Sequence, residues 1–228
     1  MPCQTLFSKG GCPVDQGEAA LAVIDAITTM ASEGVPLMLR VLPEGSGSFW
    51  THYPEDDARD QRTRSRWYYH VHAPGERDPV EHGHFHLFLQ RTQMDDPGAF
   101  VAAPEAGEDA AAHVTHIAGL AIDHRGIPMS WFATNRWVTD EFLYPAPIMI
   151  AHLDRYNVDA TREDGLVNRF LTAMVSLYRD ELGELLHSRD AALAALVEAN
   201  GPLAYESGTE VLVQIPIDLD SKIESLGL

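Results

Sequence analysis

The chain has 228 residues, of which 45% are hydrophobic and 22% are charged, as is ordinary for a globular protein that buries its own core. A formal net charge of −18 gives a surface that repels phosphate backbones and anionic lipids, so we expect neither a nucleic acid nor a membrane as a partner. Cys3 and Cys12 are the only cysteines, which excludes a disulfide framework. We expect a single domain over residues 1–228 and a cytoplasmic location, because no secretory signal and no membrane-spanning run is recognisable.

The first part of the chain is expected to hold a tail, one helix and a long loop. Residues 1–14 are rich in Gly, Pro and Cys, which predicts an irregular tail. Apolar residues at helical spacing predict a helix over residues 15–32, with Asp15 as its N-cap. Residues 43–66 mix Gly, Ser, Pro and many charges, which indicates a surface loop with one short helix near residues 55–62.

The middle of the chain shows a period of two, which is typical of strands. The predicted strands cover residues 66–72, 82–90, 115–123 and 128–134. A nine-residue connection joins the first two as an antiparallel pair, and a turn at Arg125-Gly126 joins the last two as a hairpin. Residues 93–113 are rich in Ala, Asp, Glu, Gly and Pro and are expected to form a mobile excursion between the two pairs.

The C-terminal part is expected to be mainly helical. The predicted helices cover residues 145–156, 162–186 and 191–199, the last with Ser188 as its N-cap, and a final strand covers residues 210–217. The order of elements is one helix, four strands, several helices and one strand. This order indicates an α+β fold, with an antiparallel sheet that carries a histidine-rich face and has helices packed on the other face.

Five of the 11 histidines lie between residues 70 and 86. Residues two apart on a strand project from the same face, so His70 and His72 share a face, as do His82, His84 and His86. If the connection closes the hairpin directly, His72 lies opposite His82 and His70 opposite His84, with Cβ atoms about 4.5–5.5 Å apart. Three or four imidazoles then converge on one ion, so we predict that these five histidines form a transition-metal site.

The energetic cost of grouped imidazoles favours the same interpretation. Protonated rings on one small patch repel one another, and buried neutral rings each need a hydrogen-bond partner. A metal ion relieves both costs, because it binds the neutral ring and takes its lone pair. The alternative is a set of histidines on a solvated face, or histidines bonded to Glu76, Asp78 and Glu81.

Two resemblances follow from these motifs. The sequence from Gly83 to Leu87 is similar to the His-Phe-His strand that supplies two zinc ligands in animal-type carbonic anhydrases, but the rest of that family's pattern is absent and no activity is implied. The longer stretch from Trp67 to Gln90, with Tyr-His-Val-His followed by Glu-His-Gly-His-Phe-His, resembles a bacterial family of uncharacterised proteins. Cupins also bind iron through His-x-His on a strand, but their Gly-rich signature and spaced Glu are missing.

Other residues near these strands are candidates for catalysis and substrate binding. Glu81 is predicted to ligate the metal, orient an imidazole or act as a base, and the alternative is a solvated side chain. Tyr68 shares the histidine face and is predicted to donate a proton or bind substrate, unless it only packs across strands. His116 either completes the metal shell or is a core histidine. The predicted substrate-binding residues are Phe88, Trp131, Arg136 and Trp137, for which core packing or a surface charge is the alternative.

These residues favour a metal-dependent enzyme that acts on a small organic substrate, and they leave its oligomeric state open. We rank first a mononuclear redox enzyme with one transition-metal ion, iron or copper, because all-nitrogen ligation with aromatic neighbours suits these metals. The alternatives are a zinc-dependent hydrolase or lyase, with Glu81 moving the proton, and a non-catalytic metal-binding or sensing protein.

Overall fold

The computed structural model describes residues 14–42, 47–206 and 208–228. The predicted tail over residues 1–14 therefore lies outside the described residues except for Val14. In these three stretches, no helix combines the length and the apolar character that crossing a membrane requires.

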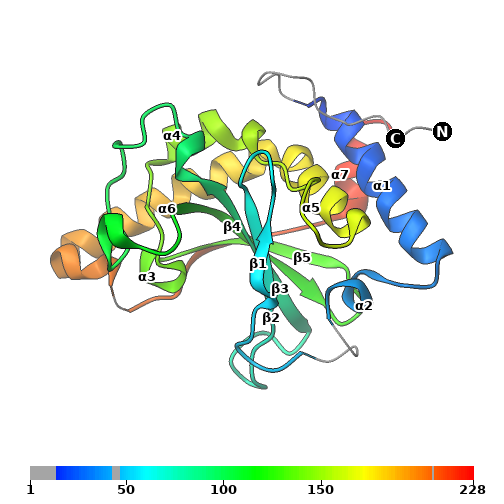
Figure 1. The fold of residues 1–228 in the computed structure, drawn as a ribbon, viewed down its shortest axis with the longest axis horizontal. Coiled ribbons are helices and arrows are strands. Elements are labelled where there is room, and N and C mark those ends of the chain that lie inside the picture. The colour runs from blue at the N-terminus through cyan, green and yellow to red at the C-terminus, as the bar shows by residue number, and fades with distance from the viewer. Residues whose placement is uncertain (1–13, 43–46, 207) are drawn as a thin grey trace.

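One six-stranded sheet organises the fold, and each neighbouring pair of strands is antiparallel. Its strands follow chain order from one edge to the other (Figure 1), because each strand is connected to its neighbour by a hairpin or a longer excursion. They are β1 (Tyr53–Arg59), β2 (Arg66–His70), β3 (Glu81–Gln90), β4 (Val114–Asp123), β5 (Pro128–Thr134) and β6 (Val211–Pro216).

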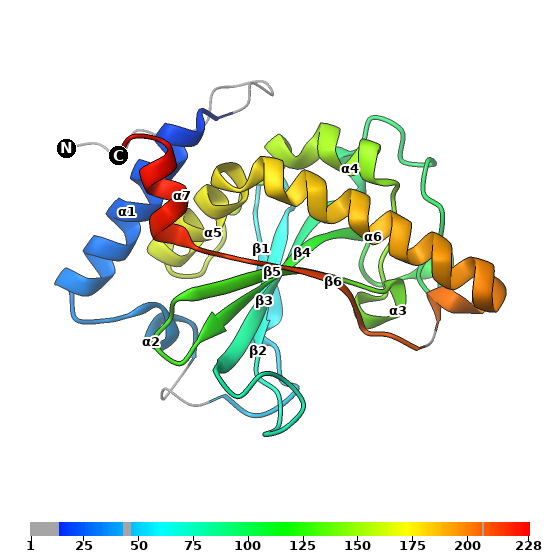
Figure 2. The same ribbon diagram turned by 180° about the vertical axis from the view of Figure 1, so that it is seen from behind.

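Helices cover one face of this sheet. The helices of the described residues are α1 (Gln16–Ser32), α2 (Leu37–Val41), α3 (Arg136–Thr139), α4 (Ala146–His152), α5 (Gly165–Leu177), α6 (Arg179–Asn200) and α7 (Leu219–Ser225). The long helix α6 lies across the sheet and packs on β4, β5 and β6, whereas α1 packs against α5 farther from the sheet (Figure 2). The side chain of Asp15 caps α1 by accepting the backbone N–H groups of Gly17 and Glu18, as predicted.

Alternation along β2 and β3 divides the sheet into two chemically different faces. Trp67, Tyr69, Phe85 and Leu87 point into the core beneath the helices, where each is at most 2% exposed. The intervening side chains Tyr68, His70, His84 and His86 point to the opposite face. The predicted α+β class, with an antiparallel sheet whose histidine-rich face lies opposite the helices, is therefore confirmed.

One prediction about the N-terminal part is wrong. Residues 53–59 form the edge strand β1, not a loop with a helix over residues 55–62. Only Ala58 of this strand is buried, and the charged side chains of Glu55, Asp56 and Arg59 face solvent while the backbone pairs with β2. An edge strand of this kind has no alternation of apolar residues that a sequence pattern would reveal. The short helix α2 was also not expected.

The C-terminal part is mainly helical, as predicted, but its helices begin and end at other residues than predicted. The predicted helix over residues 162–186 is divided at Tyr178, and α6 then continues to Asn200. Ser188 therefore lies inside a helix and is not an N-cap. The polar run at Ser188 to Asp190 does not interrupt the helix, because Arg189 is buried and donates to the backbone carbonyl of Tyr144. The predicted helix over residues 145–156 is shorter, and α7 was not expected.

Candidate metal centre

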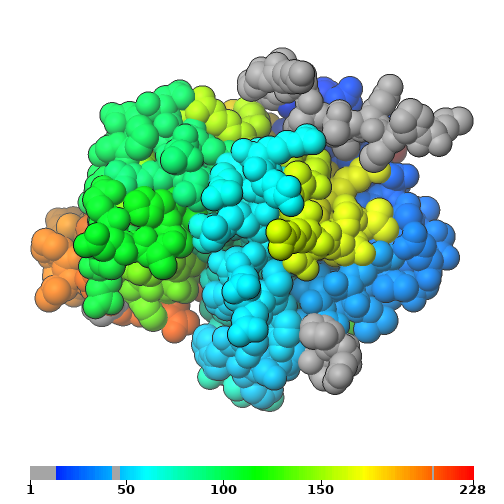
Figure 3. Space-filling view, in the orientation of Figure 1, coloured from blue at the N-terminus to red at the C-terminus, as the bar shows by residue number. Residues whose placement is uncertain are grey.

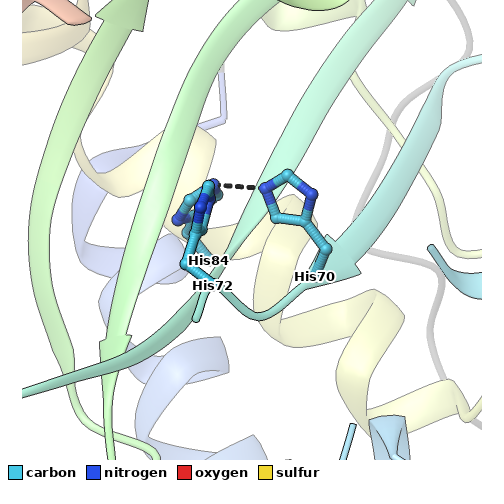
Figure 4. Close-up of side chains that lie close together, drawn as sticks. All are labelled: His70, His72 and His84. Atoms are coloured by element: carbon cyan, nitrogen blue, oxygen red, sulfur yellow. Dashed lines mark hydrogen bonds between the residues drawn. The ribbon is translucent and has the colours of Figure 1, made fainter. Parts of the chain in front are cut away.

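Three histidines bring ring nitrogens together on the face opposite the helices. His70 ends β2 and is the cross-strand partner of His84 in β3, as predicted, and His72 follows two residues after His70. One ring nitrogen from each of the three lies within 4.8 Å of the others. The Nε2 atoms of His70 and His84 are 2.6 Å apart, and Figure 4 shows these two rings pointing toward one another.

A β-bulge places Glu81 beside this cluster. Glu81 pairs with Asp123 and Gly83 with Ile122, so β3 has one more residue than β4 at this point. The extra residue reverses the alternation, and Oε1 of Glu81 lies 2.6 Å from Nδ1 of His84. With the carboxylate as acceptor, Nδ1 of His84 carries the proton and the lone pair of Nε2 points toward His70.

His72 is the least satisfied member of the cluster. Both of its ring nitrogens are buried, and neither has a hydrogen-bond partner among the described residues. Oε2 of Glu76 is 3.4 Å from Nδ1 of His72, which is longer than a normal hydrogen bond. A buried imidazole without a partner costs free energy, and a metal ion bound to a ring nitrogen would remove part of that cost.

Burial keeps the rings of the cluster neutral. Burial, together with the charges of His72, His52 and Arg77 nearby, lowers the pKa of His70 to about 3. The pKa values of His72 and His84 are also lowered, again mainly by burial. Neutral imidazoles are the form that binds metal ions. The charge state of the cluster therefore fits metal binding at neutral pH.

A second pair of histidines continues from the cluster into the protein. The ring of His86 lies 4.9 Å from that of His84, and its Nδ1 is 2.9 Å from Nε2 of His116. Nδ1 of His116 is in turn 3.2 Å from Oγ1 of Thr134. A bulge in β4 makes this possible, because Leu87 pairs with Ala118 but Phe88 pairs with His116. His86 is thus next to the cluster, and its own Nδ1 is occupied by His116.

Two glycines allow the strands and rings to approach this closely. A Cβ atom on Gly83 would lie 2.4 Å from the backbone oxygen of His70, so only glycine permits this approach of β2 and β3. A Cβ atom on Gly119 would lie 2.0 Å from the ring of Phe132. That ring therefore lies over Gly119, where its centroid is 4.9 Å from the ring of His84.

Aromatic rings cover the cluster on the remaining side. Trp50 contacts His72 edge to face with a centroid distance of 4.2 Å, and His52 stacks on Tyr68 at 3.7 Å. The ring of Tyr68 is 5.7 Å from that of His70. Trp50 and His52 lie just before β1 in the chain, and the segment around β1 forms the cyan surface that runs down the middle of the molecule in Figure 3. They keep the ligand atoms out of bulk water.

The chain matches one protein family over most of its length. The model of a family described as a domain of unknown function, DUF6969, matches residues 17–217. The chain belongs to this family. The DUF6969 match begins within α1 and includes all six strands, so each residue of the cluster lies inside it. No curated protein and no solved structure matches the chain.

Within this DUF6969 domain, the prediction that His82 shares a face with His84 and His86 is wrong. The bulge in β3 turns His82 toward the other face, where its Nδ1 lies 2.8 Å from the hydroxyl of Tyr69. Its ring contacts that of His124 at 5.2 Å. A bulge adds one residue and cannot be read from a pattern of alternate residues.

The candidate substrate-binding residues are only partly brought to the site. Phe88 shares the face of the histidines, with its ring 5.1 Å from that of His116. Trp131 does not, because it points into the core and contacts Tyr178. The guanidinium of Arg136 is buried and bonded to Asp140 and Glu206.

Trp137 also lies away from the cluster. It stands in α3 after the end of β5, and its partly buried indole N–H has no hydrogen-bond partner among the described residues. The aromatic run at the end of β5 therefore contributes a different residue, Phe132, to the histidine face. Strand alternation explains this, because Trp131 and Phe132 are neighbours and must point to opposite faces.

Sequence reasoning missed Trp50, His52, Arg77 and Phe132. The first two lie in a stretch that was read as a charged surface loop, although Phe49-Trp50-Thr51-His52-Tyr53 is unusually aromatic for such a loop. Arg77 lies in the connection between β2 and β3, where its guanidinium is 5.8 Å from the ring centroid of Phe132. A single charged residue in a loop carries no pattern that would place it near the histidines.

Proposed function

We propose that the chain is a metal-dependent enzyme whose metal ion is held by His70, His72 and His84. The observation that carries this proposal is the convergence of three neutral, buried ring nitrogens, of which those of His72 have no hydrogen-bond partner among the described residues. The contact between Glu81 and His84 supports it, because histidine ligands of metal ions commonly donate their second ring N–H to a carboxylate. With nitrogen–metal bonds of about 2.0–2.1 Å, the 2.6 Å between two Nε2 atoms must widen to roughly 3.3 Å. A small rotation of either ring supplies this.

We further propose that the enzyme is a mononuclear redox enzyme with iron or copper, acting on a small organic substrate in the cytoplasm. An iron or copper ion held by imidazoles supplies one-electron chemistry. The chain's own residues would hold the three rings in place, keep bulk water away through Trp50 and Tyr68, and move a proton at Glu81. Burial raises the pKa of the Glu81 carboxyl to about 7, which suits it to accept and release a proton near neutral pH.

A zinc-dependent hydrolase or lyase is the second candidate. The Glu81–His84 contact favours it, since the same arrangement orients zinc-bound histidines. A centre closed by a fourth protein ligand, for which His86 is the nearest candidate, would instead indicate a metal-binding or sensing role.

Elemental analysis of protein purified without a histidine tag tests the proposal directly. We expect about one iron or copper atom per chain and a matching visible or electron paramagnetic resonance spectrum. One zinc atom per chain and no redox-active metal would support the second candidate. Protein that neither carries nor takes up a transition metal in stoichiometric amount would contradict both.

A further inference from the structure

A cavity of about 450 Å³ opens beside the metal centre. It lies under the connection between β2 and β3, and His72 and Glu81 are part of its wall. A volume of this size accommodates a small organic molecule. Arg77 is the only Lys or Arg among the described residues that line it. The chain has 34 acidic but only 16 basic side chains, so a basic side chain in the wall of this cavity is unexpected.

The guanidinium of Arg77 has neighbours that position it, but they leave hydrogen-bond donors of the group without a partner among the described residues. Its side chain is only 21% exposed, and its ion-pair partner, Glu210, is half exposed and lies 3.8 Å away. That distance is longer than a charge-assisted hydrogen bond, which measures about 2.7–2.9 Å. The guanidinium lies 5.8 Å from the ring centroid of Phe132, and that ring also contacts His84. Arg77 therefore has donors left for a ligand in the cavity.

The acidic residues of the cavity are already engaged. Oδ1 of Asp78 accepts the backbone N–H of Val80 within its own loop. Glu81 is bonded to His84. Neither carboxylate is paired with Arg77 in the structure, and the ion-pair partner that the described residues offer Arg77, Glu210, stays 3.8 Å away.

A bound metal ion would add a second positive charge close to that of Arg77. Three neutral imidazoles add no negative charge to the ion, and Arg77 lines the same cavity as the proposed ligand His72. Two positive charges near one another in a partly buried site repel strongly. A negatively charged ligand between them would convert this repulsion into attraction from both sides.

We propose that this cavity binds a small carboxylic acid, with its carboxylate held between Arg77 and the metal centre. This inference rests on the proposed function and adds the class of substrate. A carboxylate fits better than a phosphate, because one planar guanidinium matches a planar carboxylate with two parallel hydrogen bonds. The lining residues also include aromatic and apolar side chains, Phe49 and Val71 among them, which suit the organic part of such an acid.

Titration of the cobalt-loaded full chain with benzoate tests this inference. We expect saturable changes in the visible cobalt spectrum with benzoate, and much weaker changes with uncharged benzamide or with inorganic phosphate. Replacing Arg77 by Met should weaken benzoate binding about 10- to 100-fold, because a hydrogen-bonded charged partner is lost. Arg77→Lys should recover part of the affinity. Arg62→Met is the matched control, since Arg62 is exposed and does not line the cavity.

The cobalt content of each variant separates the possible failures. Wild-type protein that retains no cobalt would overturn the proposed function together with this inference. Cobalt retained without any response to benzoate, or with equal benzoate affinity in wild type and Arg77→Met, would overturn the substrate class alone. If phosphate binds as tightly as benzoate, the proposal that the ligand is a carboxylic acid is also overturned. If Arg77→Met does not fold, as judged by circular dichroism, Arg77→Gln replaces it in the same titration.

Discussion

Glu81 lies 2.6 Å from Nδ1 of His84, although the two residues are three positions apart on one strand and would point to opposite faces of a regular one. The bulge at His82 brings them together, and with the carboxylate as acceptor the proton of His84 lies on Nδ1. Because of this bulge, the histidine face includes the carboxylate of Glu81, which contacts Nδ1 of His84 and leaves Nε2 of His84 as the ligand atom.

The first prediction concerns the ligands. Replacing His84 by Ala should abolish stoichiometric metal binding, because it removes the ligand that contacts both His70 and Glu81. Metal content by elemental analysis is the measurement. His187→Ala is the control, since His187 is exposed on α6 and should have no effect. Full metal content in the His84→Ala variant would exclude this residue as a ligand.

Glu81→Gln should weaken metal binding about 10- to 100-fold, which is the usual cost of losing the partner of a histidine ligand. The amide oxygen can still accept a hydrogen bond from His84, so the substitution mainly removes the negative charge of the carboxylate. Glu76→Gln should have a smaller effect, because Glu76 is exposed and lies 3.4 Å from His72. Dissociation constants from competition with a chelator compare the two variants. Equal losses would show that Glu81 acts only through the general charge of the site.

Trp50 should report metal binding by fluorescence. Its ring lies 4.2 Å from that of His72, so a bound Cu²⁺ ion would lie within quenching distance. We expect stoichiometric Cu²⁺ to quench part of the tryptophan emission of wild-type protein. Trp50→Phe should remove this quenched part while leaving the copper content unchanged. Quenching that is the same in both proteins would place the copper ion near another tryptophan.

Gly119→Ala should destabilise the fold by about 1–3 kcal/mol, because the added methyl group collides with the buried ring of Phe132. Combining it with Phe132→Leu should recover part of the loss. Gly165→Ala is the matched control, since a Cβ atom there meets no described atom within 4 Å. Urea unfolding monitored by circular dichroism gives the free energies. A cost for Gly119→Ala no greater than that for Gly165→Ala would contradict the close contact.

The buried carboxyl of Glu141 should make stability depend on pH. Burial raises its pKa from 4.5 to about 7, so the folded protein holds a proton that the unfolded chain releases. The stabilising contribution is therefore complete below pH 4.5 and lost as the pH rises through 7. Relative to Glu141→Gln, the free energy of unfolding of metal-free wild type should fall by roughly 3 kcal/mol over this range. Urea unfolding at several pH values measures it, and a difference independent of pH would contradict it.

The sequence by itself determined the sheet and its histidine face. Alternation in residues 66–72 and 82–90 predicted both strands and the pairing of His70 with His84, because a period of two assigns each side chain to a face. The match of residues 17–217 to an uncharacterised family agrees with the expectation that the chain belongs to such a family. Helix α1 and its cap at Asp15 followed from apolar spacing and cap chemistry alone.

Only the tertiary structure decided which residues surround the histidines. The bulges in β3 and β4 exchange His82 for Glu81 and bring His116 to the same face, and a bulge leaves no trace in a pattern of alternate residues. Phe132 and Arg77 reach the site across strands and from a loop, so their positions depend on contacts between distant parts of the chain. Periodicity assigns a side chain to a face, but only the packing of neighbouring strands and loops decides which side chains meet there.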